Sequence, residues 1–283
     1  MKIREIKVKS IIVKSNLPEG DFVINPYVGC QHNCIFCYAR FMKRFTGHKE
    51  PWGSFVDVKI NAPDLIPEKT EKYKNKSITI GSVTDPYQPI EKKYKITRKI
   101  LEKLIPLQAS VDILTKSDLV LRDIDLFKQF KHEKFIIGVS LAFLDDKIRE
   151  KLEPGASSAE ERISALRKLY KAGIQTAHFI SPIFPEITDW QKLIKKTKNF
   201  VDEYWFENLN LYPSIRADIY KFLQKNKPRL VSEYKKIYSK GSNYWFKEEE
   251  KIKKFCQKNK VNYRIYFHHT ISPPKNGKLK SGD

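Results

Sequence analysis

A strand, a loop and a helix follow one another repeatedly between residues 77 and 209, and this alternation constrains the fold more than any other feature. The strands are short and rich in β-branched or aromatic residues, and the helical stretches carry apolar residues at intervals of three and four. Residues 135–140 lack polar alternation, as in a sheet that is buried on both faces. Such connections join parallel strands in a right-handed sense. The sequence therefore predicts an α/β fold with a parallel sheet.

The expected elements are defined by their residue ranges. We expect strands at residues 55–60, 77–80, 110–114, 135–140, 174–180, 205–209 and 261–268. We expect helices at residues 39–45, 97–105, 118–130, 158–172, 189–204, 230–240 and 244–258. The sequence Ser158-Ala159-Glu160-Glu161 has the form of a capping box at the start of one of these helices.

Polar side chains gather in the loops that follow the predicted strands. These residues are Ser82, Thr84, Asp85, Thr115, Lys116, Ser117, Ser140, Ser181, Glu207, Asn208 and Asn210. In a barrel of parallel strands, the loops at the carboxyl ends of the strands carry the chemistry. We therefore expect a partial barrel of the TIM type with its site on one rim.

Three of the four cysteines lie within residues 25–40, NPYVGCQHNCIFCYAR. Cys30, Cys34 and Cys37 have the spacing Cys-x3-Cys-x2-Cys. Thiolates are the ligands of iron–sulfur clusters, and a cluster that is held only by protein uses four of them. Three thiolates leave one iron open for a substrate or cofactor. The segment therefore predicts a 4Fe–4S cluster with one vacant coordination position.

Two simpler interpretations compete with the cluster. A disulfide with a spare thiol is disfavoured, since a lysine-rich chain without a secretory signal is expected in a reducing cytosol. Zinc is the stronger alternative, because a Cys3His set that includes His32 or His48 suits its preference for thiolate and imidazole. His32 lies between the cysteines and would strain a tetrahedral site, so the cluster is favoured.

Composition narrows the class of protein. The chain has 283 residues, and 41% of them are hydrophobic, which is enough for one large α/β domain. No apolar run approaches the roughly 18 residues of a membrane span. The start of the chain lacks the apolar core of a signal peptide. We therefore expect a cytoplasmic protein.

The charge points to a polyanionic partner. The 54 basic residues exceed the 33 acidic ones and give a formal charge of +21. A solvated lysine surface is the alternative, but balanced ion pairs do not account for this excess. The charge favours contact with nucleic acid and does not distinguish DNA from RNA.

The alternation of strands and helices stops after residue 212. We expect residues 1–212 to form the partial barrel, with a strand-rich lead-in before the cysteines. Residues 213–283 are expected to form a mixed helical and strand extension that packs on the barrel. Its Tyr, Trp and Lys side chains either hold nucleic acid by stacking and phosphate contact, or bury the rings of an amphipathic helix.

Five stretches form a combined pattern that is more specific than the cysteine spacing. They are NPYVGCQHNCIFCYAR (25–40), VKINAPDL (58–65), ITIGSVTDPYQPIEKKYKITRKILE (78–102), ILTKSDLVLRDIDL (113–126) and LEPGASSAEERISALRKLYKAGI (152–174). This pattern resembles the spore photoproduct lyase-like branch of the radical S-adenosylmethionine (SAM) superfamily, which is also described as DNA repair photolyase-like. The resemblance covers about residues 20–210.

The resemblance implies a partial (β/α)6 barrel that binds one 4Fe–4S cluster and SAM. In such enzymes the reduced cluster cleaves SAM to methionine and a 5′-deoxyadenosyl radical, which abstracts hydrogen from a substrate. An electron donor such as ferredoxin or flavodoxin is implied as a partner, and a nucleic acid as the substrate. The protein positions this chemistry and excludes water and oxygen.

The resemblance also assigns roles by position. Cys30, Cys34 and Cys37 match the iron ligands, and Lys116 and Ser140 match positions that contact the amino-acid end of SAM. The remaining cofactor positions are Tyr38, which would border the adenine, and Ser82, Thr84 and Asp85, which lie where the superfamily binds the SAM amino group or ribose.

The sequence departs from the lyase at one place. The lyase has a hydrogen-donating cysteine in the stretch that here reads Gly81-Ser82-Val83-Thr84-Asp85, which has none. The fourth cysteine, Cys256, lies in a predicted C-terminal helix. Thymine-dimer reversal by that route is therefore not expected. Radical SAM chemistry on a nucleic acid, the same chemistry on a peptide or small molecule, and a non-enzymatic zinc-stabilised nucleic-acid-binding protein remain as hypotheses.

Overall fold

An eight-stranded sheet lies at the centre of the computed structural model, which describes residues 1–16, 20–68 and 71–268. The strand order is β11-β10-β9-β8-β7-β6-β3-β2, and all neighbours are parallel except β2 and β3. Among the described residues, β11 and β2 form the edges. The six adjacent parallel strands from β3 to β10 match the expected (β/α)6 partial barrel, so the predicted fold class is confirmed.

The strands are short, and most predicted strands are present. The large sheet contains β2 (Ile12–Lys14), β3 (Phe22–Ile24), β6 (Ser77–Ile80), β7 (Ser110–Thr115), β8 (Phe135–Ser140), β9 (Gln175–Ile183), β10 (Glu203–Asn208) and β11 (Asn262–Ile265). A second sheet has the order β1-β5-β4, formed by β1 (Lys2–Ile6), β5 (Phe55–Lys59) and β4 (Tyr27–Val28).

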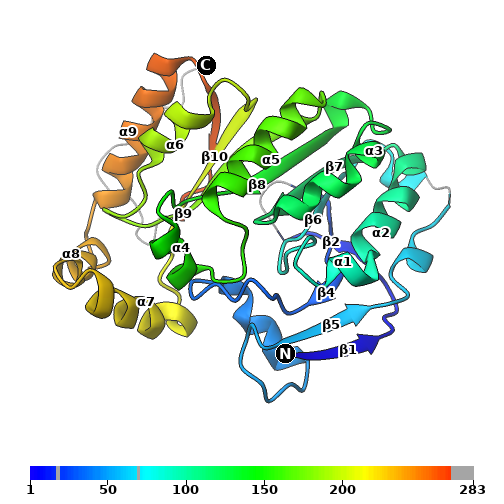
Figure 1. Cartoon of the computed structure of the whole chain (residues 1–283), viewed down its shortest axis with the longest axis horizontal. Helices are drawn as coiled ribbons and strands as arrows, with labels where there is room; N and C mark the ends of the chain where they lie inside the picture. Colours follow the sequence, from blue (N-terminus) through cyan, green and yellow to red (C-terminus); the bar gives the residue numbers. More distant parts are fainter. Residues whose placement is uncertain (17–19, 69–70, 269–283) are drawn as a thin grey trace, which may run out of the picture.

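Helices cover the large sheet and extend beyond its β10 side (Figure 1). The α-helices are α1 (Glu91–Tyr94), α2 (Ile96–Leu104), α3 (Ile124–Phe127), α4 (Asp146–Leu152), α5 (Ala159–Lys171), α6 (Trp190–Thr197), α7 (Pro213–Asn226), α8 (Leu230–Ile237) and α9 (Tyr244–Asn259). The 3-10 helices are η1 (Tyr38–Phe45), η2 (Pro63–Leu65), η3 (Glu71–Tyr73), η4 (Ile105–Leu107), η5 (Asp118–Asp123) and η6 (His132–Lys134). None of the helices in the described ranges has the length and apolar character needed to cross a lipid bilayer.

Helix α5 illustrates how local sequence signals fix an element. Ser158 accepts a hydrogen bond from the backbone N–H of Glu161, whose carboxylate accepts one from the Ser158 backbone N–H. This capping box satisfies amide groups that the first helical turn leaves unpaired, as predicted. Apolar residues at helical spacing, including Ile163, Leu166 and Leu169, are buried against β8 and β9.

Two predicted helices are wrong in extent. The helix predicted at residues 189–204 ends at Thr197, and β10 already begins at Glu203. Tyr204 is paired with His178 of β9, and its hydroxyl lies 2.9 Å from Thr197 Oγ1. A buried aromatic residue fits both patterns, and here strand pairing determines its conformation.

The second error concerns residues 118–130, which form η5 and the short helix α3 instead of one long helix. Asp123 is fully buried at the junction, where Arg98 and Arg122 pair with its carboxylate. The alternating pattern of residues 55–60 predicts a half-buried strand, but the first four residues of β5 are all buried because it lies between β1 and β4. Helices α4 and α7 were not predicted.

The chain after residue 212 contributes to the large sheet. β11 pairs with β10, and α9 lies beside α6 at this edge (Figure 1). Trp190 of α6 donates a hydrogen bond of 2.6 Å to Glu248 of α9, and its ring packs edge-on against Phe255. Residues 269–283 of the predicted extension lie outside the described residues, and the division at residue 212 stays a prediction.

His178 allows a test of how burial couples this fold to pH. It is fully buried in β9, and its ring nitrogens lie 3.0 Å from Leu141 O and 3.1 Å from Thr197 Oγ1. Burial lowers the pKa of His178 to about 4, against about 6.5 in an unfolded chain. Between these pH values only the unfolded chain binds the proton, so stability falls as the pH falls.

We therefore expect His178→Gln to remove an acid-dependent loss of about 3 kcal/mol in the free energy of unfolding between pH 6.5 and pH 4. Urea unfolding followed by circular dichroism at several pH values measures this difference. Parallel pH profiles for the variant and the parent protein would contradict the account.

Candidate functional site

The cysteine segment connects β4 to η1 and lies inside the protein. Cys30 and Cys34 are buried, Cys37 is partly buried, and all three thiols are free. Burial raises the pKa of each thiol, and the three influence one another's charge, so they lie close together. Buried thiols of this kind become thiolates when a bound cation compensates for the lost hydration. The three free, buried thiols form no disulfide in this structure, and the donor set suits a metal cluster.

A buried glutamine fixes the backbone of this segment. Gln88 is fully buried in the loop after β6. Its side-chain oxygen accepts a hydrogen bond from the backbone N–H of Gln31 at 2.9 Å, and its amide group donates to Gly29 O and to Thr84 Oγ1. Thr84 itself donates to Gly29 O at 2.6 Å. The predicted residue Thr84 thus helps to hold the backbone of the cysteine segment in place.

Asp85 connects three parts of the site. Its carboxylate accepts hydrogen bonds from the backbone N–H groups of Tyr87 and Lys116 and from Thr115 Oγ1, and it lies 3.2 Å from His32 Nδ1. Burial alone would raise the pKa of Asp85, but His32 and these donors hold it below its ordinary value. All of its acceptor capacity is used within the chain, so its role in the structure is to position the cysteine segment.

Two glycines let other parts of the chain approach the cysteines closely. A Cβ atom on Gly155 would lie 2.2 Å from the backbone oxygen of Gln31, and one on Gly53 would lie 2.0 Å from the side chain of Asn33. The backbone of Gly155 also donates a hydrogen bond to His32 O, and Ile35 donates to Leu152 O. The end of α4 therefore forms one wall of the segment.

Trp52 lies against the thiols on another side. Its ring packs with Cys30 and Cys37, and its buried Nε1–H has no nitrogen or oxygen partner among the described residues. Burial raises the pKa of Cys37, whereas the indole N–H opposes that increase. A buried donor aimed at a thiol fits a cluster, because hydrogen bonds to sulfur are a normal part of such sites.

Lys116 and Ser140 meet beside the cysteines. Lys116 Nζ donates a hydrogen bond of 2.7 Å to Ser140 Oγ, and its charge acts on Cys34 and Cys37. Among the described residues Lys116 takes part in no ion pair. Ser140 in turn donates to Ser181 O, and the buried Arg162 donates to Ser140 O. The half-buried ammonium group of Lys116 and the hydroxyl of Ser140 together suit the binding of an anionic group such as a carboxylate.

We call the region between the cysteine segment and the Lys116–Ser140 pair the opening. Ser82 and Tyr38 lie on its other side. The Tyr38 hydroxyl donates to Ser82 O, and Asn25 donates to Ser82 Oγ at 2.9 Å. Tyr38 as a whole is 43% exposed. Desolvation of the hydroxyl raises the pKa of Tyr38, and the charge of Glu207 adds to this. Tyr38 therefore lies between the cysteine segment and the end of β10.

The ends of β9 and β10 carry a further polar group that faces this opening. Ser181 Oγ donates to Glu207 Oε2 at 2.5 Å, and His268 Nε2 lies 3.5 Å from Glu207 Oε1. The hydrogen bond to Glu207 raises the pKa of His268. Asn208 holds His268 through hydrogen bonds to its backbone N–H and carbonyl groups. Ser181, Glu207 and Asn208, which were singled out by position, are thus brought together.

The histidines weigh against the zinc interpretation. His48 Nε2 lies 2.8 Å from Asp57 Oδ1 and its Nδ1 lies 3.0 Å from Glu50 Oε2, so both ring nitrogens have partners. His32 is held by Asp85. Within the described ranges, no group of three or more His, Cys, Asp or Glu residues is arranged around a single metal ion.

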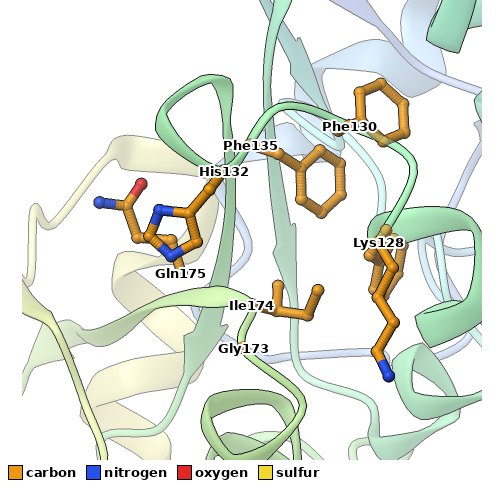
Figure 2. A pocket seen from close by; sticks show the side chains of 8 residues that line it. Lys128, Phe130, His132, Phe135, Gly173, Ile174 and Gln175 are labelled. Carbon is orange, nitrogen blue, oxygen red and sulfur yellow. The ribbon is translucent and has the colours of Figure 1, made fainter.

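A small pocket lies away from this site, at the other end of the strands (Figure 2). Its volume is about 130 Å³, and Phe135 and Gln175, the first residues of β8 and β9, line it together with Lys128 and His132. The cysteines and Ser140 lie at the carboxyl ends of the parallel strands, where this fold class places its chemistry. We therefore place the functional site at the cysteine segment.

Sequence reasoning missed Gln31, Gln88, Gly155 and Trp52, which hold the cysteine segment in place. Gln88 directly follows the Asp85-Pro86-Tyr87 turn, and Gly155 ends the Glu153-Pro154-Gly155 turn after α4. The Pro154-Gly155 pair, which marks a turn, is the sequence signal that was available for Gly155. Of the other predicted residues, Ser117 caps η5, and the Asn210 carbonyl accepts a hydrogen bond from the backbone N–H of Tyr212.

Three comparisons with known proteins agree with this geometry. A family model described as the radical SAM superfamily matches residues 24–196. An uncharacterized protein of Methanocaldococcus jannaschii is 41% identical over 262 residues, which is 90% of this chain and 98% of that protein.

Solved structures of spore photoproduct lyase have the same fold. The lyase complexed with dinucleoside spore photoproduct superposes with a TM-score of 0.68 at 18% identity, over 94% of this chain and 82% of the lyase. A mutant of the lyase with bound AdoMet and the dinucleoside also gives 0.68, at 17% identity, with the same coverage.

The close approach of Gly155 gives a test of the site. Gly155 is outside the left-handed region, so Gly155→Ala acts through contact alone and pushes on the Gln31 backbone. We expect it to reduce the iron bound after anaerobic purification and to lower stability by about 1–3 kcal/mol, as overpacking does. Iron analysis and thermal unfolding measure the two effects.

Gly173→Asn is the matched control. Gly173 has a φ of +76° and open space around it, and asparagine tolerates that conformation. The control should keep the iron content of the parent protein. Full iron content in Gly155→Ala would show that α4 does not support the cysteine segment.

Proposed function

This chain belongs to the radical SAM superfamily, and from that premise we propose that it directs a 5′-deoxyadenosyl radical at a nucleic-acid substrate. It is a radical SAM enzyme, and its cofactors are a 4Fe–4S cluster and SAM. The zinc-stabilised, non-enzymatic hypothesis is therefore rejected. The reduced cluster, when bound, supplies the electron that cleaves SAM to methionine and the radical.

We assign the iron ligands and the SAM contacts to residues of the carboxyl-end rim. Cys30, Cys34 and Cys37 would hold three irons of the cluster and leave the fourth for SAM. Lys116 and Ser140 would hold the methionine carboxylate, because an ammonium group that forms no ion pair with the described residues and a hydroxyl lie 2.7 Å apart beside Cys34. This contact is the single observation that carries the assignment of the SAM site.

The other assigned residues complete the SAM site. Tyr38 would border the adenine with its exposed ring, and the loop of Ser82, Thr84 and Asp85 would face the amino group or ribose. In this loop Thr84 and Asp85 are committed to holding the cysteine segment, which leaves the backbone around Ser82 as the part that faces the opening. Lys116 and Ser140 orient the cofactor, and the buried walls formed by Trp52 and Phe36 exclude water.

Two observations support a nucleic-acid substrate. The formal charge of +21 favours a polyanion, and the lyase of similar fold was solved with a dinucleoside spore photoproduct. Because Gly81–Asp85 contains no cysteine, we do not assign lesion reversal by the lyase's route. Burial raises the pKa of Cys256 to about 12 and leaves it unreactive in α9. The proposed reaction is lesion repair or nucleoside modification, with ferredoxin or flavodoxin as the electron donor.

Turnover tests this function. We expect the anaerobically reconstituted protein to form 5′-deoxyadenosine from SAM and dithionite, and DNA or RNA to stimulate that reaction. Binding of the nucleic acid should weaken steeply with added salt, because phosphate contacts release counterions. Mass spectrometry of the products measures both 5′-deoxyadenosine and altered nucleosides.

The possible results separate the hypotheses. Absence of 5′-deoxyadenosine under every condition would overturn the enzyme proposal. Formation of 5′-deoxyadenosine without stimulation, together with weak and salt-insensitive binding, would instead favour a peptide or small-molecule substrate. Zinc without iron or sulfide after anaerobic purification would contradict the cluster.

Lys116→Met tests the carboxylate contact. We expect roughly tenfold to hundredfold weaker SAM binding with the cluster absorbance retained, since a charged hydrogen bond is lost. Equilibrium dialysis against labelled SAM measures the affinity. Lys99→Met removes an exposed lysine of α2 and serves as the charge-matched control. Equal SAM affinity in both variants would remove Lys116 from the proposed site.

A further inference from the structure

The helix that follows the cysteines exposes aromatic rings to solvent. In η1, Tyr38, Phe41 and Phe45 are 43%, 41% and 67% exposed, and Tyr212, which precedes α7, is 39% exposed. We call these four residues the aromatic ridge. Four of the eight large exposed hydrophobic residues in the described part of the chain belong to it. Apolar surface that is concentrated in this way marks a binding surface.

The ridge is continuous because η1 packs on α7. Arg40 pairs with Asp218 of α7 at 2.5 Å and donates to Ile35 O, which ties the helix to its neighbours. Arg40 also donates a hydrogen bond to Ser214 O, two residues after Tyr212, so the start of α7 lies beside η1. Tyr38 and Phe41 are three residues apart and therefore share a face of this 3-10 helix, and Arg44 lies beside the rings of both Phe41 and Phe45.

The charge on the ridge is positive. The sequence of η1, YARFMKRF, contains three basic residues and no acidic one. The Arg44 guanidinium lies 4.7 Å from the ring centroid of Phe45 and 5.6 Å from that of Phe41. Arg44 takes part in no ion pair within the described ranges. Aromatic faces beside an unpaired arginine are what proteins use to hold single-stranded nucleic acid.

The position and length of the ridge fit a single strand of nucleic acid that enters the site. Tyr38 directly follows Cys37 and is hydrogen-bonded to Ser82 O, so one end of the ridge borders the opening. A 3-10 helix rises about 2.0 Å per residue, which places Phe45 about 14 Å farther along. At about 3.4 Å per stacked nucleotide, the ridge matches about four nucleotides.

We propose that the aromatic ridge binds an unpaired segment of DNA or RNA and delivers one nucleotide to the opening beside Cys37. The inference rests on the proposed nucleic-acid function and adds where the strand lies and that it is single-stranded. Bases stack on Phe41 and Phe45, and Arg44 contacts the phosphates. A membrane surface is the main alternative, but a 3-10 helix of eight residues is too short for the broad apolar face of an interfacial helix.

Binding of labelled oligonucleotides to the reconstituted holoenzyme tests the ridge. The probes are oligothymidylate and oligouridylate of about 12 nucleotides and a duplex of the same length, read by fluorescence anisotropy at several salt concentrations. We expect the single strands to bind more tightly than the duplex. The double substitution Phe41→Ala/Phe45→Ala should weaken single-strand binding about tenfold or more. Phe45→Trp should retain it.

Two further variants separate stacking from charge and from general damage. Arg44→Gln should reduce the slope of log affinity against log salt by about one phosphate contact. Tyr170→Ala removes a ring that is 44% exposed at the end of α5, before β9 begins, and should bind like the parent protein. Iron content and 5′-deoxyadenosine formed without nucleic acid are measured for each variant, and Phe41→Leu/Phe45→Leu replaces the alanine pair if iron is lost.

The outcomes decide between the ridge and the rest of the proposal. Unchanged single-strand affinity in the phenylalanine variants overturns the ridge, even if the enzyme still modifies nucleic acid. Tighter binding to duplex, or ridge-dependent binding to anionic phospholipid vesicles without oligonucleotide binding, also overturns it. Failure of the proposed function appears separately, as absence of 5′-deoxyadenosine in the parent protein.

Discussion

The buried carboxylate of Asp85 is the contact on which the site depends. It accepts hydrogen bonds from the loop after β6 and from the end of β7, and it pairs with His32 in the cysteine segment. A buried carboxylate is costly unless its acceptors are satisfied, and here the surrounding donors keep it ionised. The fold therefore cannot place Asp85 without also placing the first cysteines relative to β7.

This arrangement leaves the side chain of Lys116 available. The backbone N–H of Lys116 is bound to Asp85, but its ammonium group extends to Ser140 and the thiols. The nearby buried cation Arg162 is neutralised by Glu153, and Arg122 and Arg98 are paired with Glu91 and Asp123. The charges of these three arginines are thus balanced by carboxylates, whereas the Lys116 ammonium group is left for an anionic ligand.

The sequence predicts what depends on local pattern and strand direction. Parallel strands bring their carboxyl ends to one edge, so Lys116 and Ser140 were expected together and lie 2.7 Å apart. The contacts of Gln88 with Gln31 and of Gly155 with His32 join segments more than fifty residues apart and have no periodic signal. The helix predicted at residues 189–204 extended too far for a similar reason. Pairing across the sheet, and not the local pattern, determines the conformation of Tyr204.

The continuity of the chain from Cys37 into η1 links the cluster segment to the exposed surface. Gln88 and Asp85 hold this segment from inside, and Arg40 holds η1 against α7 from outside. Tyr38 is therefore fixed at both ends, with its hydroxyl on Ser82 O and its ring toward solvent. Bases that stack on Phe41 and Phe45 of the same helix are therefore positioned by the contacts that also position the cysteines.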